Sequence, residues 1–472
     1  MATPPVLVPD FAVTINGVDL ETKDETKVFE VVFNDRVDAA DFFSIQLGLV
    51  DGAVARPDWI DDPLFREGGK AQIKLGYAGD ALKTMIDGEI TAVHPHFTSR
   101  GPTTLVLQGF DRLHRLRRGR KSRTFLNMSD REIAQKIADE NGLQLQCADP
   151  PNIKHEHVYQ HNQSDLDFLV RLATRIGYEV KVEEKTLHFR RSKESRAKVT
   201  TLQWSEPGDT ELSSLVLRLS TADQVSEVTV QGWNPKEKRQ IVGRARTGDE
   251  STRMAGSHTA GEVATAAFGR AQRVVVDHPI ATVEEAEALA RAKFNELSLG
   301  FIVGEGLSLG NPDIRAGAVI ELKGLGQLLS GLYYVVASNH TCGRDTHGYI
   351  TEFTVTRNAS TGGPADGATT AGASAAPSGG AGSAAARSGV GAGGAAAAAD
   401  GTATKKTDWI EIKLVDQEGK PVPGEKYRVE LPDGSTRQGV LNSQGVAWEG
   451  NLDPGTCKIT FPDLDGTEWR RA

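Results

Sequence analysis

The stretch VYQHNQSDLDFLVRLATRIGY, residues 158–178, decides the fold. Its centre predicts a helix over 165–176, because Ser164 is a good N-cap and apolar residues then recur at the spacing of one helix face. Gly177 can adopt the left-handed backbone conformation that commonly ends a helix. The stretch therefore predicts a helix with a defined start and a sharp stop.

A second helix is predicted just upstream, over 130–141. Ser129 and Glu132 have the spacing of a capping box, in which each side chain bonds a free backbone N–H of the first turn. A predicted β-hairpin, 178–182 with 187–190, follows the first helix. These elements together predict a small α/β insertion at about 115–200.

The chain on either side of this insertion is predicted to be mostly strands. Asn16-Gly17 follows an alternating apolar and polar run, which is the strongest short signal for a β-hairpin. A third helix is predicted over 283–297, where Thr282 and Glu285 form another capping box. The other predicted strands are 28–33, 43–47, 72–75, 90–93, 104–107, 225–230, 319–322, 333–336 and 353–355.

The two strand-rich segments echo each other. AQIKL at 71–75 is echoed by AVIEL at 318–322, and the strand at 88–93 is echoed by the strand at 331–336. A duplication of one β-domain accounts for this echo, and so does chance, because alternating strand patterns recur in unrelated sequences.

Composition restricts the class of protein. The chain has 472 residues and a formal net charge of −9, which argues against a nucleic-acid binder because phosphate binding requires a cationic surface. Cys147, Cys342 and Cys457 are far apart, so neither a disulfide framework nor a thiolate zinc site is expected. We find no signal peptide and no apolar run long enough to span a bilayer, and we expect no stable membrane insertion.

Ala, Gly, Ser and Thr dominate residues 359–407. Such a segment cannot bury enough apolar surface to offset the entropy lost on ordering, so it is predicted to be a disordered linker. Residues 408–472 then alternate apolar and polar residues between turn signals, at the spacing of a small β-sandwich.

The residues of 158–178 resemble a signature of the phage late control D and VgrG family, in which a Tyr-x-Gln strand leads into a Ser-Asp-x-Asp-Phe helix that ends at glycine. RTFLNMS at 123–129 is similar to the strand that precedes the neighbouring helix of that family. GNPDIRAG at 310–317 and SGLY at 330–333 are similar to its last barrel. The resemblance covers about 1–358.

This resemblance implies the hub of a contractile, phage-tail-like injection system. The fold expected from it is mainly β, with two related tail-tube-like β-barrels. The expected parts are a first β-barrel hub domain (1–114), an α/β insertion (115–200), a second β-barrel hub domain (201–358), the linker (359–407) and a transthyretin-like or immunoglobulin-like β-sandwich (408–472).

The same resemblance implies the partners. Three copies are expected to form a homotrimer that adapts a hexameric tail tube to a trimeric spike, in contact with baseplate proteins. VgrG-type chains continue into a long needle, whereas only about 65 residues follow the linker here. The spike is therefore expected to be a separate polypeptide. Assembly is expected in the bacterial cytoplasm, with the protein then carried in the particle.

Two motifs suggest chemistry that their context contradicts. Gly306-Leu-Ser308-Leu-Gly310 matches a nucleophile elbow, but no helix can follow it, so Ser308 is interpreted as a loop residue. The GxGxxG match at 389–394 lies in low-complexity sequence and lacks the strand and acidic residue of a dinucleotide site.

Three histidines, His155, His157 and His161, form a cluster without a carboxylate or cysteine at ligand spacing. A solvated or interface strand is favoured over a metal site, because zinc sites need ligands that converge. The carboxylate pairs Asp61-Asp62 and Glu183-Glu184 are adjacent in sequence, and nothing shows that either faces a catalytic cleft.

One basic run is the main electrostatic feature. We interpret it either as a solvated linker or as a contact with acidic neighbouring subunits, because it lacks the interleaved aromatic residues of a single-strand binder. The run comprises Arg112, Arg115, Arg117, Arg118, Arg120, Lys121 and Arg123.

These observations lead to three hypotheses. A structural hub is preferred, with no enzyme activity, no catalytic residue, no cofactor and no metal site. A carrier that holds cargo or an adaptor on residues 408–472 is the first alternative. A tip-associated peptidoglycan hydrolase is the least favoured.

Overall fold

The computed structural model divides the chain into two compact units, Met1–Ser374 and Ala375–Ala472, and each is described by itself. The described residues are 7–20, 26–49, 61–97, 103–148, 150–151, 153–192, 194–205, 211–343, 348–362, 408–414, 422, 425–431, 435–441, 446–452 and 458–461.

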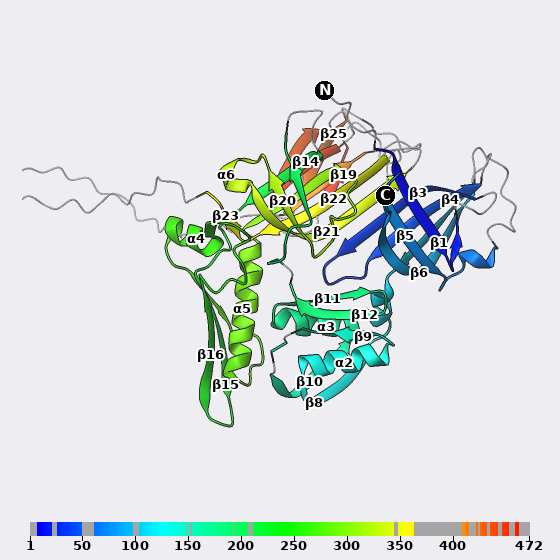
Figure 1. Cartoon of the computed structure of the whole chain (residues 1–472). Helices are drawn as coiled ribbons and strands as arrows, with labels where there is room; N and C mark the ends of the chain where they lie inside the picture. Colours follow the sequence, from blue (N-terminus) through cyan, green and yellow to red (C-terminus); the bar gives the residue numbers. More distant parts are fainter. Residues whose placement is uncertain are drawn as a thin grey trace, which may run out of the picture. The chain divides into compact units, whose positions relative to one another are not determined.

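Thirteen of the described strands form one large sheet in the first unit (Figure 1). Its main path runs β14-β19-β22-β21-β3-β4-β7-β6-β5-β1-β2, with β20 pairing β21 and β13 pairing β20 beside that path. The strands are β1 Pro9–Ile15, β2 Val18–Asp19, β3 Thr26–Arg36, β4 Phe42–Leu49, β5 Lys70–Tyr77, β6 Lys83–His96, β7 Thr104–Phe110, β13 Thr200–Gln203, β14 Leu212–Leu219, β19 Ile302–Leu309, β20 Val319–Lys323, β21 Gly331–Gly343 and β22 Gly348–Arg357.

The predicted strands lie within observed ones, except that the strand predicted from 225 begins at Glu227, so the mainly β fold class is confirmed. The first hairpin joins β1 to β2 through Asn16 and Gly17, with Ile15 opposite Val18. Both turn residues have positive φ, 50° and 84°, as a type I′ turn requires.

The sheet contains the same strand order twice. β3-β4-β7-β6-β5 in the first half corresponds to β14-β19-β22-β21-β20 in the second. The irregularities correspond too, since β6 skips Thr91 against β7 and β21 skips Val336 against β22. In the same way, β3 skips Phe29 against β4 and β14 skips Ser213 against β19. Two matched β-bulges favour duplication over chance, because a bulge is a specific local feature.

The matched bulges also correct the alignment of the two halves. They place Thr91 with Val336, and therefore Gly88 with Tyr333. The echo in the sequence places Gly88 with Gly331 instead, which is two residues out of register. Side chains alternate with a period of two along a strand, so a shift of two leaves the apolar pattern unchanged and cannot be detected from it.

Each half of the sheet has its own apolar core. The first core joins Phe11 and Ile73 of β1 and β5 to Phe33 and Phe43 of β3 and β4, so this half-sheet curves over its own side chains. The second core gathers side chains of β13, β14 and β19 to β22. No ladder between described strands closes either half into a ring, so the expected barrels are open in the single chain.

The predicted α/β insertion forms around a separate core, and both of its predicted helices are confirmed. Ser129 and Glu132 make the expected capping box, and Ser164 caps the second helix. The elements are η3 Arg112–Arg117, β8 Lys121–Ser129, α2 Asp130–Glu140, β9 Gln144–Gln146, β10 Lys154–Gln163, α3 Asp165–Arg175, β11 Tyr178–Glu183 and β12 Thr186–Arg191.

A second insertion lies between β14 and β19, where the first half has only the short connection from β3 to β4. Helix α5, Val283–Leu299, is the third predicted helix and starts at the predicted Thr282 and Glu285 capping box. It packs along β15 and β16, as Figure 1 shows. The other elements are β15 Glu227–Asn234, β16 Arg239–Arg246, β17 His258–Thr259, α4 Ala260–Phe268 and β18 Gln272–Val275.

The remaining short elements include a correction to the predicted linker. Ala359 and Ser360 are buried and form β23 (Ala359–Ser360), which pairs with β17, so ordered structure runs past the predicted start at Ala359. The rest of the predicted linker, 363–407, lies outside the described residues. Two short helices complete the unit, η2 Pro63–Phe65 and α6 Gly326–Leu329.

The second unit is built from strands, as predicted. Its described strands form two small sheets, β24-β27 and β26-β25-β28. Tyr427, Val429, Leu431, Leu441 and Phe461 form its buried core. The strands are β24 Asp408–Lys413, β25 Lys426–Glu430, β26 Thr436–Val440, β27 Val446–Leu452 and β28 Lys458–Thr460.

The Gly243→Ala substitution should lower the free energy of unfolding by about 1–3 kcal/mol, the usual cost of overpacking. A β-carbon at Gly243 would lie 2.2 Å from the backbone carbon of Ala286, so α5 would have to move off β16. Urea unfolding followed by circular dichroism measures this. Gln240→Ala, at an exposed site of the same strand, is the control, and equal stability of both variants would contradict the packing described.

Candidate assembly interface

The two halves of the sheet meet along β21. The first part of β21 pairs with β20 of its own half, and Ala337 to Gly343 pair with Arg36 to Glu30 of β3 in the other half. One continuous strand therefore belongs to both halves, and its pairing with β3 is the junction between them.

A buried carboxylate, Asp35, lies at this junction. It accepts hydrogen bonds from Arg315 Nε (2.6 Å), from the backbone N–H of Ala316 (3.1 Å) and from the Ser338 hydroxyl. Burial alone would raise the pKa of Asp35, but Arg315, Lys181 and these hydrogen bonds outweigh it and lower that pKa. The guanidinium of Arg315 also lies 4.5 Å from the centre of the Phe33 ring.

The α/β insertion is attached to the same cluster. Lys181 of β11 places its Nζ 3.8 Å from both Asp35 and Asp41. Burial raises the pKa of Asp41 to about 6, despite the nearby Lys181. Beside it, Asp38 accepts a hydrogen bond from the backbone N–H of Val180 (2.7 Å). Three parts of the unit therefore converge on one group of acidic residues.

A second ionic contact joins the two insertions. His155 of β10 donates from Nε2 to Asp130 (3.1 Å) and from Nδ1 to Glu285, the capping residue of α5. Burial would lower the pKa of His155, but the bonds to Asp130 and Glu285 outweigh it and raise that pKa to about 9. His155 is buried where the two insertions meet, whereas His157 and His161 of the same strand are exposed.

The basic run is paired within the chain to a large extent. Arg115 binds the buried Glu89 with two hydrogen bonds of 2.7 Å. Lys121 and Arg123 both bind Asp165, at 2.6 and 2.9 Å. The run forms η3 and the start of β8, and Arg115, Arg117, Arg118 and Arg120 are exposed to solvent.

Ser308 lies in a strand and not in the predicted loop. It belongs to β19, is 1% exposed, and donates to the carbonyl oxygens of Leu309 and Thr351. Strand β19 was missed because glycines interrupt its apolar pattern. Gly306 is needed there, since a β-carbon would lie 2.3 Å from the Phe353 ring.

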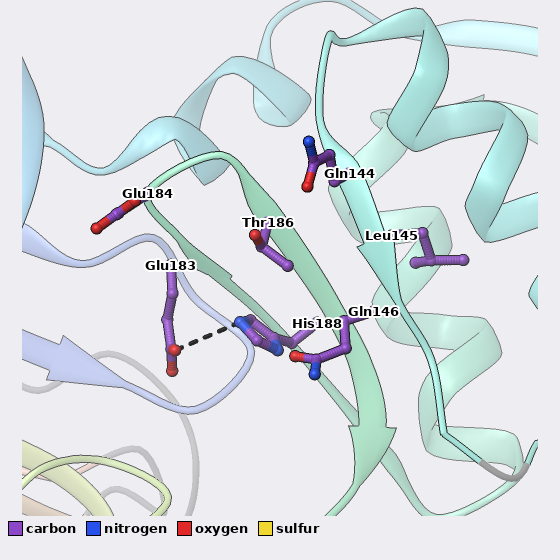
Figure 2. Close-up of a pocket in the computed structure, with 7 residues that line it drawn as sticks. All are labelled: Gln144, Leu145, Gln146, Glu183, Glu184, Thr186 and His188. Carbon is purple, nitrogen blue, oxygen red and sulfur yellow. Dashed lines mark ion pairs between the residues drawn. The ribbon is translucent and has the colours of Figure 1, made fainter.

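A groove in the α/β insertion is shown in Figure 2. An ion pair joins His188 to Glu183 at 3.3 Å, and the hydrogen bond from His188 lowers the pKa of Glu183 to about 2. No cysteine, serine or lysine nucleophile lines it among the described residues. Its lining residues are Gln144, Leu145, Gln146, Glu183, Glu184, Thr186 and His188.

The remaining chemical candidates do not converge. Asp62 caps η2 by accepting from the N–H of Leu64, and Asp61 pairs with Arg66 at the surface. Within the described ranges, no group of three or more His, Cys, Asp or Glu side chains is arranged to hold a metal ion. None of the described helices has the length and apolar character that a bilayer-spanning segment requires. The GxGxxG match at 389–394 lies outside the described residues.

The cluster around Asp35 is the feature that the sequence did not predict. In the sequence, Arg315 belongs to the GNPDIRAG run, and Asp35 lies 280 positions away from it. The available signal was an aspartate inside a strand, where aspartate is depleted.

Comparison with known proteins agrees with this architecture. A model of the Alg8 N-terminal domain family matches residues 6–343. The chain belongs to this family. Two solved structures are similar, the 43 kDa tail protein of prophage MuSo2 from Shewanella oneidensis (TM-score 0.54) and the tail protein of Neisseria meningitidis MC58 (TM-score 0.53). Each is 14% identical and covers 74% of this chain, over 98% and 97% of its own length. The chain therefore has the fold of these phage tail proteins.

The Arg315→Met substitution should cost about 3–5 kcal/mol of unfolding free energy, because it leaves Asp35 as a buried and poorly paired charge. Urea unfolding of Arg315→Met, Asp35→Asn and the double variant measures the coupling between the two side chains. We expect the double variant to lose less than the sum of the two single losses. Arg66→Met, at the exposed pair with Asp61, should cost less than about 1 kcal/mol. Strictly additive losses would show that the junction does not depend on this pair.

The pH dependence of stability should reveal His155. Its folded pKa of about 9 lies above the ordinary value of 6.5, so its stabilisation is complete below pH 6.5 and is lost as pH rises through 9. His155→Gln should therefore flatten the decline of unfolding free energy between pH 7 and 10, by on the order of 1–2 kcal/mol. His157→Gln, on the exposed part of the same strand, is the control. An unchanged slope for His155→Gln would contradict a charged His155.

Proposed function

We propose that this chain is the structural hub of a contractile, phage-tail-like injection system and that three copies form its ring. The observation that carries the proposal is the strand unit that occurs twice in one chain, in the same order and with the same two bulges. Three such chains present six similar units. In a ring of this kind the six β-units follow approximate sixfold symmetry, and the other parts of the three chains follow threefold symmetry.

The fold shared with two phage tail proteins supports this proposal, as does the resemblance of residues 158–178 to the phage late control D and VgrG family. In it, the two hub domains, 1–114 and 201–358, form the ring and contact a hexameric tail tube protein. The α/β insertion, 115–200, and the part of the chain beyond the ring follow the threefold symmetry of a separate spike. Baseplate proteins surround the hub, and assembly takes place in the bacterial cytoplasm before the particle forms.

We further propose that the protein acts by binding and not by catalysis, with no catalytic residue and no cofactor. The charged clusters at Asp35 and His155 support this, because each of them holds two parts of the chain together. Asp35 joins the halves, and His155 joins the insertions. A catalytic group needs a side chain directed into a space that a substrate can enter.

A carrier role for the second unit is a second candidate. The observation that favours it is that residues from Ala375 onward form a separate compact unit with a core of their own. In this proposal the segment 363–407 is the tether, and the module 408–472, similar in pattern to transthyretin-like or immunoglobulin-like sandwiches, holds cargo or an adaptor.

Mass photometry and native mass spectrometry test the hub proposal. The full chain at micromolar concentration, alone or with its tube protein, should give a species of three chains. A variant that ends at residue 362 should give the same trimer, because the ring is proposed to lie before the linker. Chains that remain single in the presence of the tube protein would overturn the hub. Loss of the trimer only in the shortened variant would instead assign assembly to the second unit.

A further inference from the structure

Two strand edges of the large sheet lack a pairing strand among the described residues. Strand β6 pairs with β5 only as far as Glu89, whereas Ala92 to His96 pair with β7 alone. Strand β14 is one end of the path and pairs with β19 alone. Unpaired backbone groups on an edge strand are a ready template for pairing with another chain.

These two edges are the counterparts of the two strands that already pair inside the chain. The duplication places β6 with β21 and β14 with β3. The second part of β21 pairs with β3 at the internal junction. The second part of β6 therefore corresponds to the second part of β21, and β14 corresponds to β3. The two free edges thus have the backbone geometry of the two strands that pair at the internal junction. They are separated by six strands of the path, so they do not pair with each other within the described part of the chain.

The apolar side chains of the free edge are less buried than their counterparts at the internal junction. Val31 and Phe33 of β3 are fully buried at the internal junction. Their counterparts on β14, Leu215 and Leu217, are only half-buried, and Val216 between them is 69% exposed. An exposed row of apolar side chains along a strand edge is a liability in a single chain.

We propose that a second copy of this chain covers these edges, with β6 of one copy pairing antiparallel to β14 of the next. The register follows from the internal junction, where Ser338 lies opposite Asp35 and Asn339 opposite Asn34. The equivalent pairs between copies are Val93 with Leu219, His94 with Arg218, Pro95 with Leu217 and His96 with Val216.

The proposed junction has the geometry of the internal one and a different chemistry. Val93 and Leu219 occupy the positions of Ser338 and Asp35, so an apolar pair replaces the buried carboxylate. This suits a contact that forms between folded chains, because apolar burial drives association without leaving charges to desolvate.

This contact is heterologous, since one edge of each copy meets the other edge of the next. Such contacts close into a ring or continue as a filament, depending on the rotation between copies. The inference rests on the proposed hub, which requires closure after three copies, and adds the surfaces and the register by which the copies meet.

Charge substitutions at His94 test the register. Both His94 and Arg218 are exposed in the single chain, so the fold tolerates changes at either. His94→Glu should strengthen assembly and His94→Lys should weaken it, because opposite charges directly across two strands attract and like charges repel. We expect the concentration at half-assembly to move by about three- to tenfold in opposite directions, since three junctions change at once. Adding Arg218→Glu to His94→Lys should restore assembly.

Cysteine cross-linking gives a second readout. Val93→Cys combined with Leu219→Cys, with the native cysteines replaced, should give disulfide-linked chains after mild oxidation. The two single-cysteine variants are controls, as is Val93→Cys with Leu215→Cys, which is four residues out of register. A trimer that neither cross-links at 93 and 219 nor responds to the charges overturns this inference and leaves the hub standing. The absence of any trimer overturns both.

Discussion

The structure depends on the buried carboxylate of Asp35. Removing an ionised carboxylate from water costs several kcal/mol, so it must be matched by donors close at hand. Arg315, the Ala316 N–H and Ser338 supply them from the second half, and Lys181 adds a charge from the insertion. Asp35 itself belongs to the first half. The charge is stable only when all three parts are in place, which makes their arrangement specific.

The duplication explains why the internal junction can be polar. The two halves belong to one chain, so closing their junction costs loop entropy and no loss of translational freedom. A network with demanding geometry can then form during folding. The proposed junction between separate chains must offset the full cost of association, and half-buried Leu215, Leu217 and Leu219 would provide apolar surface for it. The same strand geometry therefore favours different side chains in the two settings.

Local signals in the sequence predicted local structure well. The three capped helices start where Ser129, Ser164 and Thr282 indicate, because a cap depends only on neighbouring residues. Register and remote contacts were not predictable in the same way. The alternation of apolar residues cannot distinguish a shift of two, glycines hid strand β19, and the Arg315 and Asp35 pair spans 280 positions. The candidate interface could be found only by aligning the bulges, which no residue pattern reveals.

The parts of the first unit are each held together by apolar cores, and the contacts between parts combine apolar packing with buried ion pairs. His155 joins β10 to α5 through Asp130 and Glu285, and Tyr334 of β21 donates to Glu179 of the insertion, which also binds Arg190. Buried ion pairs add little stability compared with apolar packing, but an unmatched charge is strongly penalised. A wrong arrangement of the parts therefore loses more free energy through unmatched charges than the correct arrangement gains from its ion pairs. That asymmetry suits a component whose two insertions must hold fixed directions while its strand edges stay open for neighbours.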